Sequence, residues 1–362
     1  MSRTERDWPR RSVSESDDVD ANGHRGGPHG LSRRDFVAAS LGAFAVAALA
    51  PTALGRRRRR LVRRSIPVMG TVAEIAVVAD GDRDRSRAAI DAAFAELRRV
   101  DRTMTRYSDR SDVGRANLHA SSRPVSVEPA TAHVIRRALA WARASDGVFD
   151  PCLAGAVALW DVKHRSEPPP PERVRHWADR GLYRDLELDR SGDRARVRYA
   201  DPDVGLDLGG IAKGYAVDRA VRALRDHGVR DALVNAGGDL YALGRSPDGD
   251  AWKIGVRSPA DPSRIVSTVR LRDRGVATSG DYEQYFAHGG RRYHHLLDPR
   301  TGTPRRTRIH STTVSAESCL DADAAATAAF GADPADARRL LATVDPGADL
   351  IRPGNHPKEV PS

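Results

Sequence analysis

The residues best suited to hold a metal lie in the stretch DADAAATA, residues 321–328. Asp323 and Thr327 are four residues apart on an expected helix, so their side chains face the same way. Carboxylate and hydroxyl oxygens are hard ligands of the kind that Mg²⁺ prefers. Asp321 lies six residues from Thr327, about 120° away around the helix, so the spacing favours Asp323. Taken alone, such a pair is more often a polar spot on an alanine-rich helix.

A glycine-rich stretch in the middle of the chain, DLGGIAKGYAVD at residues 207–218, could hold a phosphate. We expect a strand over 204–208, a turn at Gly209-Gly210 and then a helix with an apolar period of about 3.6 residues. Free N–H groups at a helix start suit a phosphate. Lys213 is one of four lysines among 59 basic residues, and an ammonium is a compact phosphate partner. A plain strand-to-helix turn with a solvated lysine is an equally good interpretation of this stretch alone.

A pair of adjacent histidines, His294 and His295, could supply a base, because the pKa of histidine allows proton transfer near neutrality. The two side chains alternate along an expected strand, so only one of them can point inward. A pair of surface histidines is the alternative. The sequence Asp298-Pro299-Arg300-Thr301-Gly302 follows and predicts a β-turn with proline at its second position.

Six short motifs in this order resemble the FAD:protein FMN transferase family, the ApbE-like flavin transferases. They are PVMGT (67–71), DGVFDP (146–151), the stretch 207–218, VNAGGD (234–239), HLLDPRTG (295–302) and the stretch 321–328. The resemblance implies an α+β, T-fold-related fold, with mixed and largely antiparallel sheets packed with helices in two lobes. It also implies Mg²⁺, FAD as the donor, and a threonine or serine of another protein as the acceptor.

The resemblance also assigns roles to the candidate residues. It implies a metal site at Asp323, Thr327 and Gly210, where Gly210 could offer only its backbone carbonyl, so that the metal would rely more on water. It implies that His295, rather than His294, is the catalytic histidine. Lys213 matches a position that contacts the ligand.

The implied flavin pocket draws on Met69, Tyr107 and Phe149, because a thioether and two aromatic rings offer polarizable surface to a flat ring. For Phe149 taken alone, plain core packing is the better interpretation. Asp150 and Asp207 would accept hydrogen bonds from ligand N–H or hydroxyl groups. The remaining implied contacts are Val148 and Leu297.

Runs of expected strands mixed with runs of helices predict an α+β fold. The expected helices are 83–102, 131–145, 211–224, 319–330, 334–343 and a short one from 172. The expected strands are 71–78, a hairpin over 186–199 that turns at 191–192, 232–235, 252–257, 265–271, 282–288 paired with 291–297, and 312–316. Residues 106–117 are expected to form a loop.

The net charge of +10 on 362 residues raises the question of nucleic-acid binding. The excess of positive charge is concentrated in one segment, since residues 56–64 hold seven arginines and no acidic residue. No nucleic-acid motif accompanies it, so we expect no nucleic-acid partner. Cys152 and Cys319 are the only cysteines, which excludes a disulfide framework and leaves open one disulfide or two free thiols.

The composition of the N-terminal region predicts that the protein is exported. Residues 1–30 are polar and expected to be disordered, and 31–55 contain Arg33-Arg34 before a short apolar run, which is typical of a Tat signal or an uncleaved anchor. The expected cleavage sites end at residue 50 or 55. Residues 56–64 would be an arginine-rich linker, 65–345 the flavin transferase domain, and 346–362 a C-terminal tail. We therefore expect a periplasmic or otherwise extracytoplasmic protein.

Together these features predict an enzyme that moves FMN from FAD to a Thr or Ser hydroxyl of a partner flavoprotein, at an Asp-x-x-Thr/Ser-Gly-type site, and releases AMP. Two alternatives remain open. One is an FAD pyrophosphatase that gives free FMN and AMP. The other is a non-catalytic FAD-binding protein that serves a respiratory complex.

Overall fold

The computed structural model describes residues 44–46, 59–79, 81–191, 194–261 and 263–351. The expected disordered region 1–30, the arginine pair Arg33-Arg34, both expected cleavage sites and residues 352–362 lie outside the described residues. Within the expected signal segment, the structure describes one short strand, β1 (Phe44–Val46), which pairs antiparallel with β9 (Trp252–Arg257).

A seven-stranded sheet in the order β17-β16-β11-β8-β7-β3-β2 forms the centre of the fold, and every neighbouring pair is antiparallel. Met69 and Gly70 join β2 to β3 with φ angles of 53° and 70°. Positive φ at both residues is the two-residue hairpin turn that matches the twist of the strands. The strands are β2 (Leu61–Val68), β3 (Thr71–Val78), β7 (Ala232–Ala236), β8 (Asp239–Leu243), β11 (Arg274–Gly280), β16 (Ser311–Ala316) and β17 (Asp349–Ile351).

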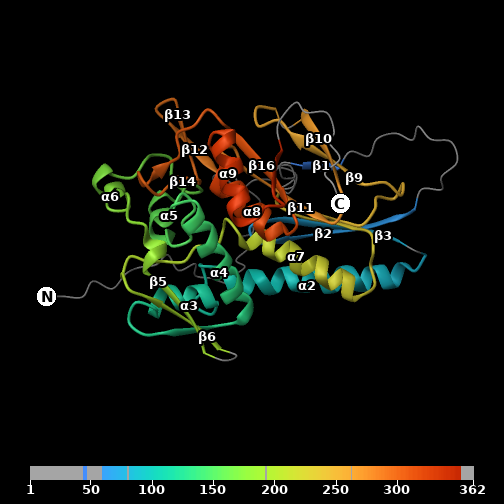
Figure 1. The fold of residues 1–362 in the computed structure, drawn as a ribbon, viewed down its shortest axis with the longest axis horizontal. Coiled ribbons are helices and arrows are strands. Elements are labelled where there is room, and N and C mark those ends of the chain that lie inside the picture. Colours follow the sequence, from blue (N-terminus) through green and yellow to red (C-terminus); the bar gives the residue numbers. More distant parts are fainter. Residues whose placement is uncertain (1–43, 47–58, 80, 192–193, 262, 352–362) are drawn as a thin grey trace, which may run out of the picture.

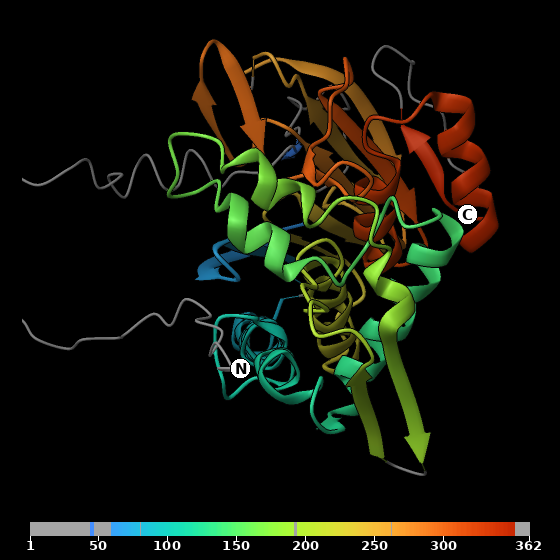
Figure 2. The same cartoon turned by 90° about the vertical axis from the view of Figure 1, so that its left-hand side faces the viewer.

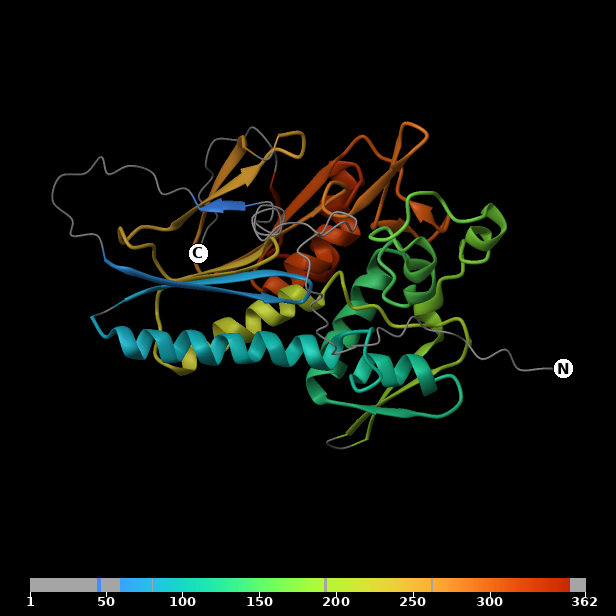
Figure 3. The ribbon, with the colours of Figure 1, turned by 180° about the vertical axis from the view of Figure 1, so that it is seen from behind.

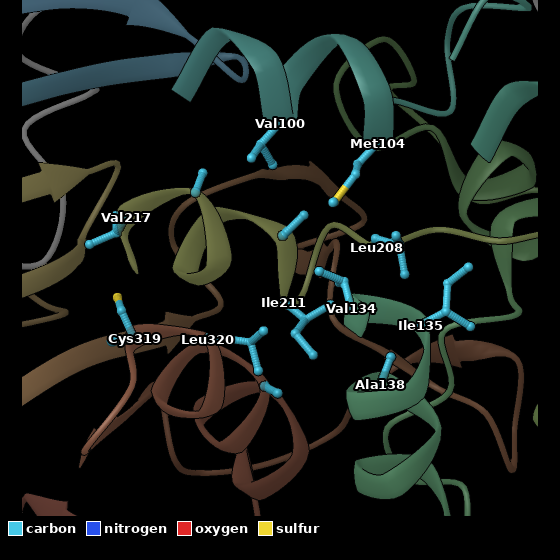
Figure 4. Packing of buried hydrophobic residues seen from close by; sticks show 14 of the residues in the cluster. Val100, Met104, Val134, Ile135, Ala138, Leu208, Ile211, Val217, Cys319 and Leu320 are labelled. Carbon is cyan, nitrogen blue, oxygen red and sulfur yellow. The ribbon is translucent and has the colours of Figure 1, made fainter. Parts of the chain in front are cut away.

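Two long helices, α2 (Arg83–Met104) and α7 (Ala212–Asp226), lie side by side along one face of this sheet, below β2 and β3 in Figure 1 and again in Figure 3. Helix α8 (Cys319–Ala329) packs against α7, β11 and β16, and α4 (Pro129–Ala144) packs on α8. Figure 4 shows the meeting point, with Met104 of α2, Leu320 of α8 and Val134 of α4 around Ile211 at the start of α7.

The alanine-rich sequence of α8 lets this helix approach its neighbours closely, and the helix is buried almost all round. A Cβ built at Gly214 of α7 would lie 2.1 Å from the carbonyl oxygen of Cys319. Gly214 therefore sets how closely α7 and α8 can approach each other. Asp218 of α7 accepts the backbone N–H groups of Cys319 and Leu320 at 2.8 and 2.9 Å, which fixes the start of α8 against α7.

The remaining elements extend from this centre, and Figure 2 shows the β5–β6 and β12–β13 hairpins at opposite ends of the molecule. A three-stranded sheet has the order β4-β6-β5 and another the order β1-β9-β10, while β12-β13 and β14-β15 are separate pairs. The elements are α3 (Asp112–His119), β4 (Val125–Val127), α5 (Ala154–Trp160), α6 (Pro171–Arg175), η1 (Leu182–Asp185), β5 (Leu186–Ser191), β6 (Arg194–Tyr199), β10 (Ile265–Leu271), β12 (Tyr285–His288), β13 (Arg291–His294), β14 (Leu297–Asp298), β15 (Thr303–Pro304) and α9 (Pro334–Val344).

The predicted fold class is confirmed, and the bounds predicted for β3, β9 and β10 are those of the structure. The strand predicted over 204–208 is wrong. Only one isolated bridge forms there, between Gly205 and Leu153. The backbone of Leu206 is engaged instead by the side chain of Asn117, which accepts its N–H at 2.7 Å and donates to its carbonyl at 2.9 Å.

Other differences follow from local signals. The loop predicted over 106–117 contains the start of α3, because Ser111 caps this helix by accepting the N–H of Gly114 at 2.8 Å. The predicted linker 56–64 overlaps β2, which begins at Leu61, and the predicted tail contains β17. The hairpin over 282–297 is shorter than predicted.

Cys152 and Cys319 are both buried, free cysteines. Among the described residues, we find no helix with the length and apolar character needed to cross a membrane.

Candidate functional site

Asp323 lies on α8 where this helix faces the start of α7, and it is 3% exposed. Its Oδ2 accepts the backbone N–H of Gly214 at 3.0 Å, and its Oδ1 lies 3.5 Å from Nζ of Lys213. Lys213 also forms an ion pair with Asp239. Burial alone would lower the pKa of Lys213, but the charges of Asp239 and Asp323 raise it above its ordinary value. The ammonium therefore stays charged at neutral pH.

Thr327, one turn further along α8, faces the turn that precedes α7. Its Oγ1 lies 3.1 Å from Oγ of Ser279 on β11. A Cβ built at Gly210 would lie 3.2 Å from Thr327 Oγ1 and 3.2 Å from the ring of Phe149. A side chain at position 210 would press on both groups, so glycine is the residue that fits there. The fold thus brings Gly210, Thr327 and Phe149 into contact from three separate segments.

The two adjacent histidines have different surroundings. His294 is buried, and both of its ring nitrogens are engaged: Nδ1 accepts the N–H of Leu296 at 3.3 Å, and Nε2–H donates to the carbonyl of Arg305 at 3.0 Å. His295 is half-buried, and its Nδ1–H donates to the carbonyl of Gln284 at 3.3 Å, which leaves the lone pair on Nε2. Burial lowers the pKa of His295 to about 4. Its imidazole is therefore neutral at physiological pH, with the Nε2 lone pair able to accept a proton, and it is a weaker base than an ordinary histidine.

Three charged residues near Lys213 and His295 were missed by the sequence analysis as site residues. Asp239 ends the motif at 234–239, so the motif held the signal for it. Glu283 follows β11 and is solvent-exposed as a residue, while the protein atoms crowded around its carboxylate raise its pKa to about 7, with the charges of Lys213 and Asp323 also acting on it. Lys163, between α5 and α6, is among the charges that lower the pKa of His295. No pattern in the sequence marks Glu283 or Lys163.

The loop after α4 carries three of the expected flavin contacts. Phe149 is buried in the main core, with its ring beside the glycine turn, and Val148 is half-buried next to it. The carboxylate of Asp150 accepts the N–H groups of Cys152 at 2.8 Å and Tyr183 at 3.3 Å. Burial raises the pKa of Asp150 to about 6. These hydrogen bonds show that the Asp150 carboxylate holds the backbone of its own loop and joins it to Tyr183.

Tyr107 and Asp207 are brought together by Arg106, which the sequence analysis did not single out. Arg106 Nε lies 3.0 Å from Asp207 Oδ2, and the Arg106 guanidinium lies 4.4 Å from the centroid of the Tyr107 ring. Tyr107 is 58% exposed, so its ring is open to a flat ligand. Asp207 also accepts the N–H of Gly209 at 2.9 Å, which ties the Tyr107 loop to the glycine turn.

Met69 occupies the turn between β2 and β3 at the edge of this region. Its N–H donates to Asp101 Oδ2 at 3.1 Å. A Cβ built at the neighbouring Gly70 would lie 3.9 Å from Nζ of Lys163. The Met69 turn is therefore adjacent to one of the charges that act on His295.

Leu297 and the turn that follows it have the predicted local structure. Leu297 is buried and pairs with Pro304. The carbonyl of Asp298 accepts the N–H groups of Thr301 at 3.1 Å and Gly302 at 2.8 Å. The β-turn predicted over 298–302 is therefore present.

Asp321, two residues before Asp323, points to a different partner. Its carboxylate forms an ion pair with Arg137 and accepts the indole N–H of Trp141 at 3.0 Å, and both of these residues lie on α4. Asp321 thus joins α8 to α4 and is directed away from Lys213. The separation of Asp321 from Asp323 that the helical spacing predicted is present in the structure.

Asp323, Thr327 and Gly210 offer oxygen donors, which are the ligands that a hard cation such as Mg²⁺ prefers. Among the described residues, no three or more His, Cys, Asp or Glu side chains cluster as metal ligands. The donors Asp323, Thr327 and Gly210 differ from such a cluster, because they offer one carboxylate, one hydroxyl and one backbone carbonyl. Mg²⁺ is commonly held in this way, through one or two carboxylates together with water and substrate phosphates. Because Lys213 already shares the charge of the Asp323 carboxylate, a cation held by this set would also need the negative charge of a substrate phosphate.

Comparison with known proteins gives one consistent result. The model of the ApbE family matches residues 69–351. A FAD:protein FMN transferase of Treponema pallidum is 35% identical over 292 residues, which cover 76% of this chain and 80% of the relative. Another, from Klebsiella pneumoniae, is 35% identical over 250 residues, which cover 67% of this chain and 76% of the relative.

Solved structures agree with the sequence comparison. The crystal structure of the ApbE protein of Thermotoga maritima superposes with a TM-score of 0.72 and 31% identity, and covers 82% of this chain and 97% of that one. The flavin transferase ApbE of Vibrio cholerae gives a TM-score of 0.67 and 28% identity, with 78% and 90% covered. The resemblance found from the six motifs is thereby confirmed, as is the fold class.

Proposed function

This chain belongs to the ApbE family, and we propose that it transfers FMN from FAD to a threonine or serine hydroxyl of a partner flavoprotein, with release of AMP. It is an enzyme of the transferase class, as its relatives are. FAD is its donor. The observation that supports the proposal most is the convergence of Lys213, Asp323 and Thr327 with the glycine turn, because this grouping combines a charged ammonium with hard oxygen donors.

The side chains suggest how the reaction would proceed. The acceptor hydroxyl attacks the phosphorus next to riboflavin, forming an O–P bond, while the bond from that phosphorus to the AMP oxygen breaks. His295 Nε2 accepts the hydroxyl proton, since its Nδ1–H is already donated to Gln284. Lys213 holds the pyrophosphate as a point charge. Tyr107, stacked under Arg106 and exposed, offers one face to the flavin ring.

We propose that Mg²⁺ binds at Asp323, Thr327 and the carbonyl of Gly210. When bound there, it would neutralise the pyrophosphate and stabilise the charge that develops on the leaving AMP. A Cβ built at Gly210 would lie 3.2 Å from the Thr327 hydroxyl, and this proximity of the glycine turn to Thr327 supports a site shared by the two residues.

The test of the proposed function is to incubate the purified protein with FAD, Mg²⁺ and a polypeptide that carries an Asp-x-x-Thr-Gly segment. Covalent FMN on the polypeptide with equal release of AMP supports transfer. AMP with free FMN and an unmodified polypeptide would instead identify a pyrophosphatase. FAD binding without AMP release would identify a non-catalytic flavin-binding protein.

We also propose that the protein is exported by the Tat route and acts outside the cytoplasm, on the strength of Arg33-Arg34 before a short apolar run. The double variant Arg33→Lys/Arg34→Lys should then remain in the cytoplasmic fraction. Normal export of this variant would remove the assignment.

A further inference from the structure

Arg305 lies where three segments of the site meet, and its side chain is bonded to backbone carbonyls of all three. Its Nε donates to the carbonyl of Leu297 at 3.0 Å. One Nη donates to Thr327 at 2.8 Å and to Phe330 at 3.0 Å, and the other donates to Val148. These carbonyls belong to the His295 segment, the C-terminal end of α8 and the Phe149 loop.

The backbone of Arg305 reinforces this arrangement. Its N–H donates to the carbonyl of Leu296 at 2.9 Å, and its carbonyl accepts Nε2–H of His294 at 3.0 Å. Residues on both sides of His295 are therefore held by Arg305. A displacement of Arg305 would move the His295 backbone with it.

The position at the end of α8 gives the guanidinium a further role. The last carbonyls of a helix lack partners within the helix and carry partial negative charge. Arg305 satisfies those of Thr327 and Phe330. Among the described residues, no carboxylate forms a salt bridge with Arg305, so these carbonyls are its main polar partners. Burial lowers the pKa of Arg305 to about 10, opposed by the charge of Asp298, and the group still carries its charge at neutral pH.

We propose that Arg305 is a positioning residue, which holds the proton-accepting His295, the Thr327 hydroxyl and the Phe149 loop in one fixed geometry. Its five N–H donors in a rigid planar fork can serve four carbonyls at once, whereas a lysine ammonium presents three donors from a single point. A displacement of about 1 Å at a reacting centre can reduce a rate by about 10²-fold. This inference deepens the proposed function and rests on it for the role of His295.

The variants to compare are Arg305→Lys and Arg305→Met, with Arg274→Met as the matched control. Arg274 also bonds a backbone carbonyl, that of Gly347, and lies on β11 away from the described contacts of Arg305. The first measurement is amide hydrogen exchange of the ligand-free protein. We expect faster exchange in the segments around 148, 297 and 330 together in both Arg305 variants, and no change there in the control. Unchanged exchange in any one of the three segments would overturn the proposal.

The second measurement is kcat and KM for FAD, normalised to the amount of protein that binds FAD. We expect kcat to fall by about 10–100-fold in both Arg305 variants, with KM changed far less. A kcat within twofold of the parent protein, or an equal loss in Arg274→Met, would contradict the proposal. Because hydrogen exchange needs no turnover, failure of the proposed function itself would show separately, as an inactive parent protein with the exchange result intact.

Discussion

The ammonium of Lys213 lies 3.5 Å from the carboxylate of Asp323, across 110 residues of sequence, and it is simultaneously paired with the buried Asp239. One positive charge thus serves two acids at the junction of α7, α8 and β8. This arrangement gives Lys213 two separable roles. It stabilises the fold by compensating the acids, and in the proposed reaction it holds the pyrophosphate of FAD.

Replacing Lys213 with Met should separate these roles. The variant leaves a buried carboxylate without its partner, which we expect to cost about 3 kcal/mol of unfolding free energy. Adding Asp239→Asn should recover most of that stability, measured by chemical denaturation. FMN transfer should stay low in the double variant because the phosphate partner is still missing. Full recovery of transfer would show that Lys213 acts only on stability.

The two adjacent histidines should respond differently to substitution. His295→Ala should slow AMP release by about 10²–10⁴-fold, the usual size of a general-base effect, with little change in FAD affinity. His294→Ala should act mainly on stability, because both of its ring nitrogens bond within the fold. Rate measurements on both variants, with thermal unfolding alongside, test this difference. The reverse result would assign proton transfer to His294.

The pH profile of kcat/KM gives an independent test of His295. Burial lowers its pKa to about 4, so the neutral base persists well below the ordinary histidine range. Glu283, whose pKa is raised to about 7, also takes up a proton in this range, so the profile is measured in Glu283→Gln, where we expect the rate to hold as the pH falls through 6.5 and to decline only as it approaches about 4. In His295→Ala, this acid limb should vanish. A limb centred near 6.5 would mean that His295 is not the group that titrates.

Asp321 should contribute to stability and not to the reaction. Its carboxylate binds Arg137 and the indole of Trp141, so Asp321→Asn should lower the free energy of unfolding by about 1.5–3 kcal/mol, the range for hydrogen bonds to a charged group. The rate per folded molecule should be unchanged, since Asp321 points away from Lys213. Loss of Mg²⁺-dependent activity in the folded variant would place Asp321 in the metal site.

Helical periodicity and the order of the motifs predicted the fold class and the relative placement of several candidate site residues. The spacing of Asp323 and Thr327 put both on one face of α8, and it separated Asp321, as the structure has them. The segment 204–208 was mistaken for a strand because its apolar residues suggested one, whereas Asn117, far away in sequence, takes the hydrogen bonds of Leu206. Glu283 and Arg305 could not be found from the sequence, since their roles depend on contacts with distant segments that no local pattern encodes.

We propose that Asp323, with Thr327 and Gly210, holds the Mg²⁺ needed for FMN transfer. Asp323→Asn keeps the size and one oxygen but removes the only full negative charge in this set, which Mg²⁺ needs. The most direct measurement is the intact mass of the acceptor polypeptide after reaction with FAD at several Mg²⁺ concentrations. We predict a gain of one FMN less one water with the parent protein, none with Asp323→Asn at low Mg²⁺, and partial recovery at high Mg²⁺. Full modification by Asp323→Asn at low Mg²⁺ would contradict the account.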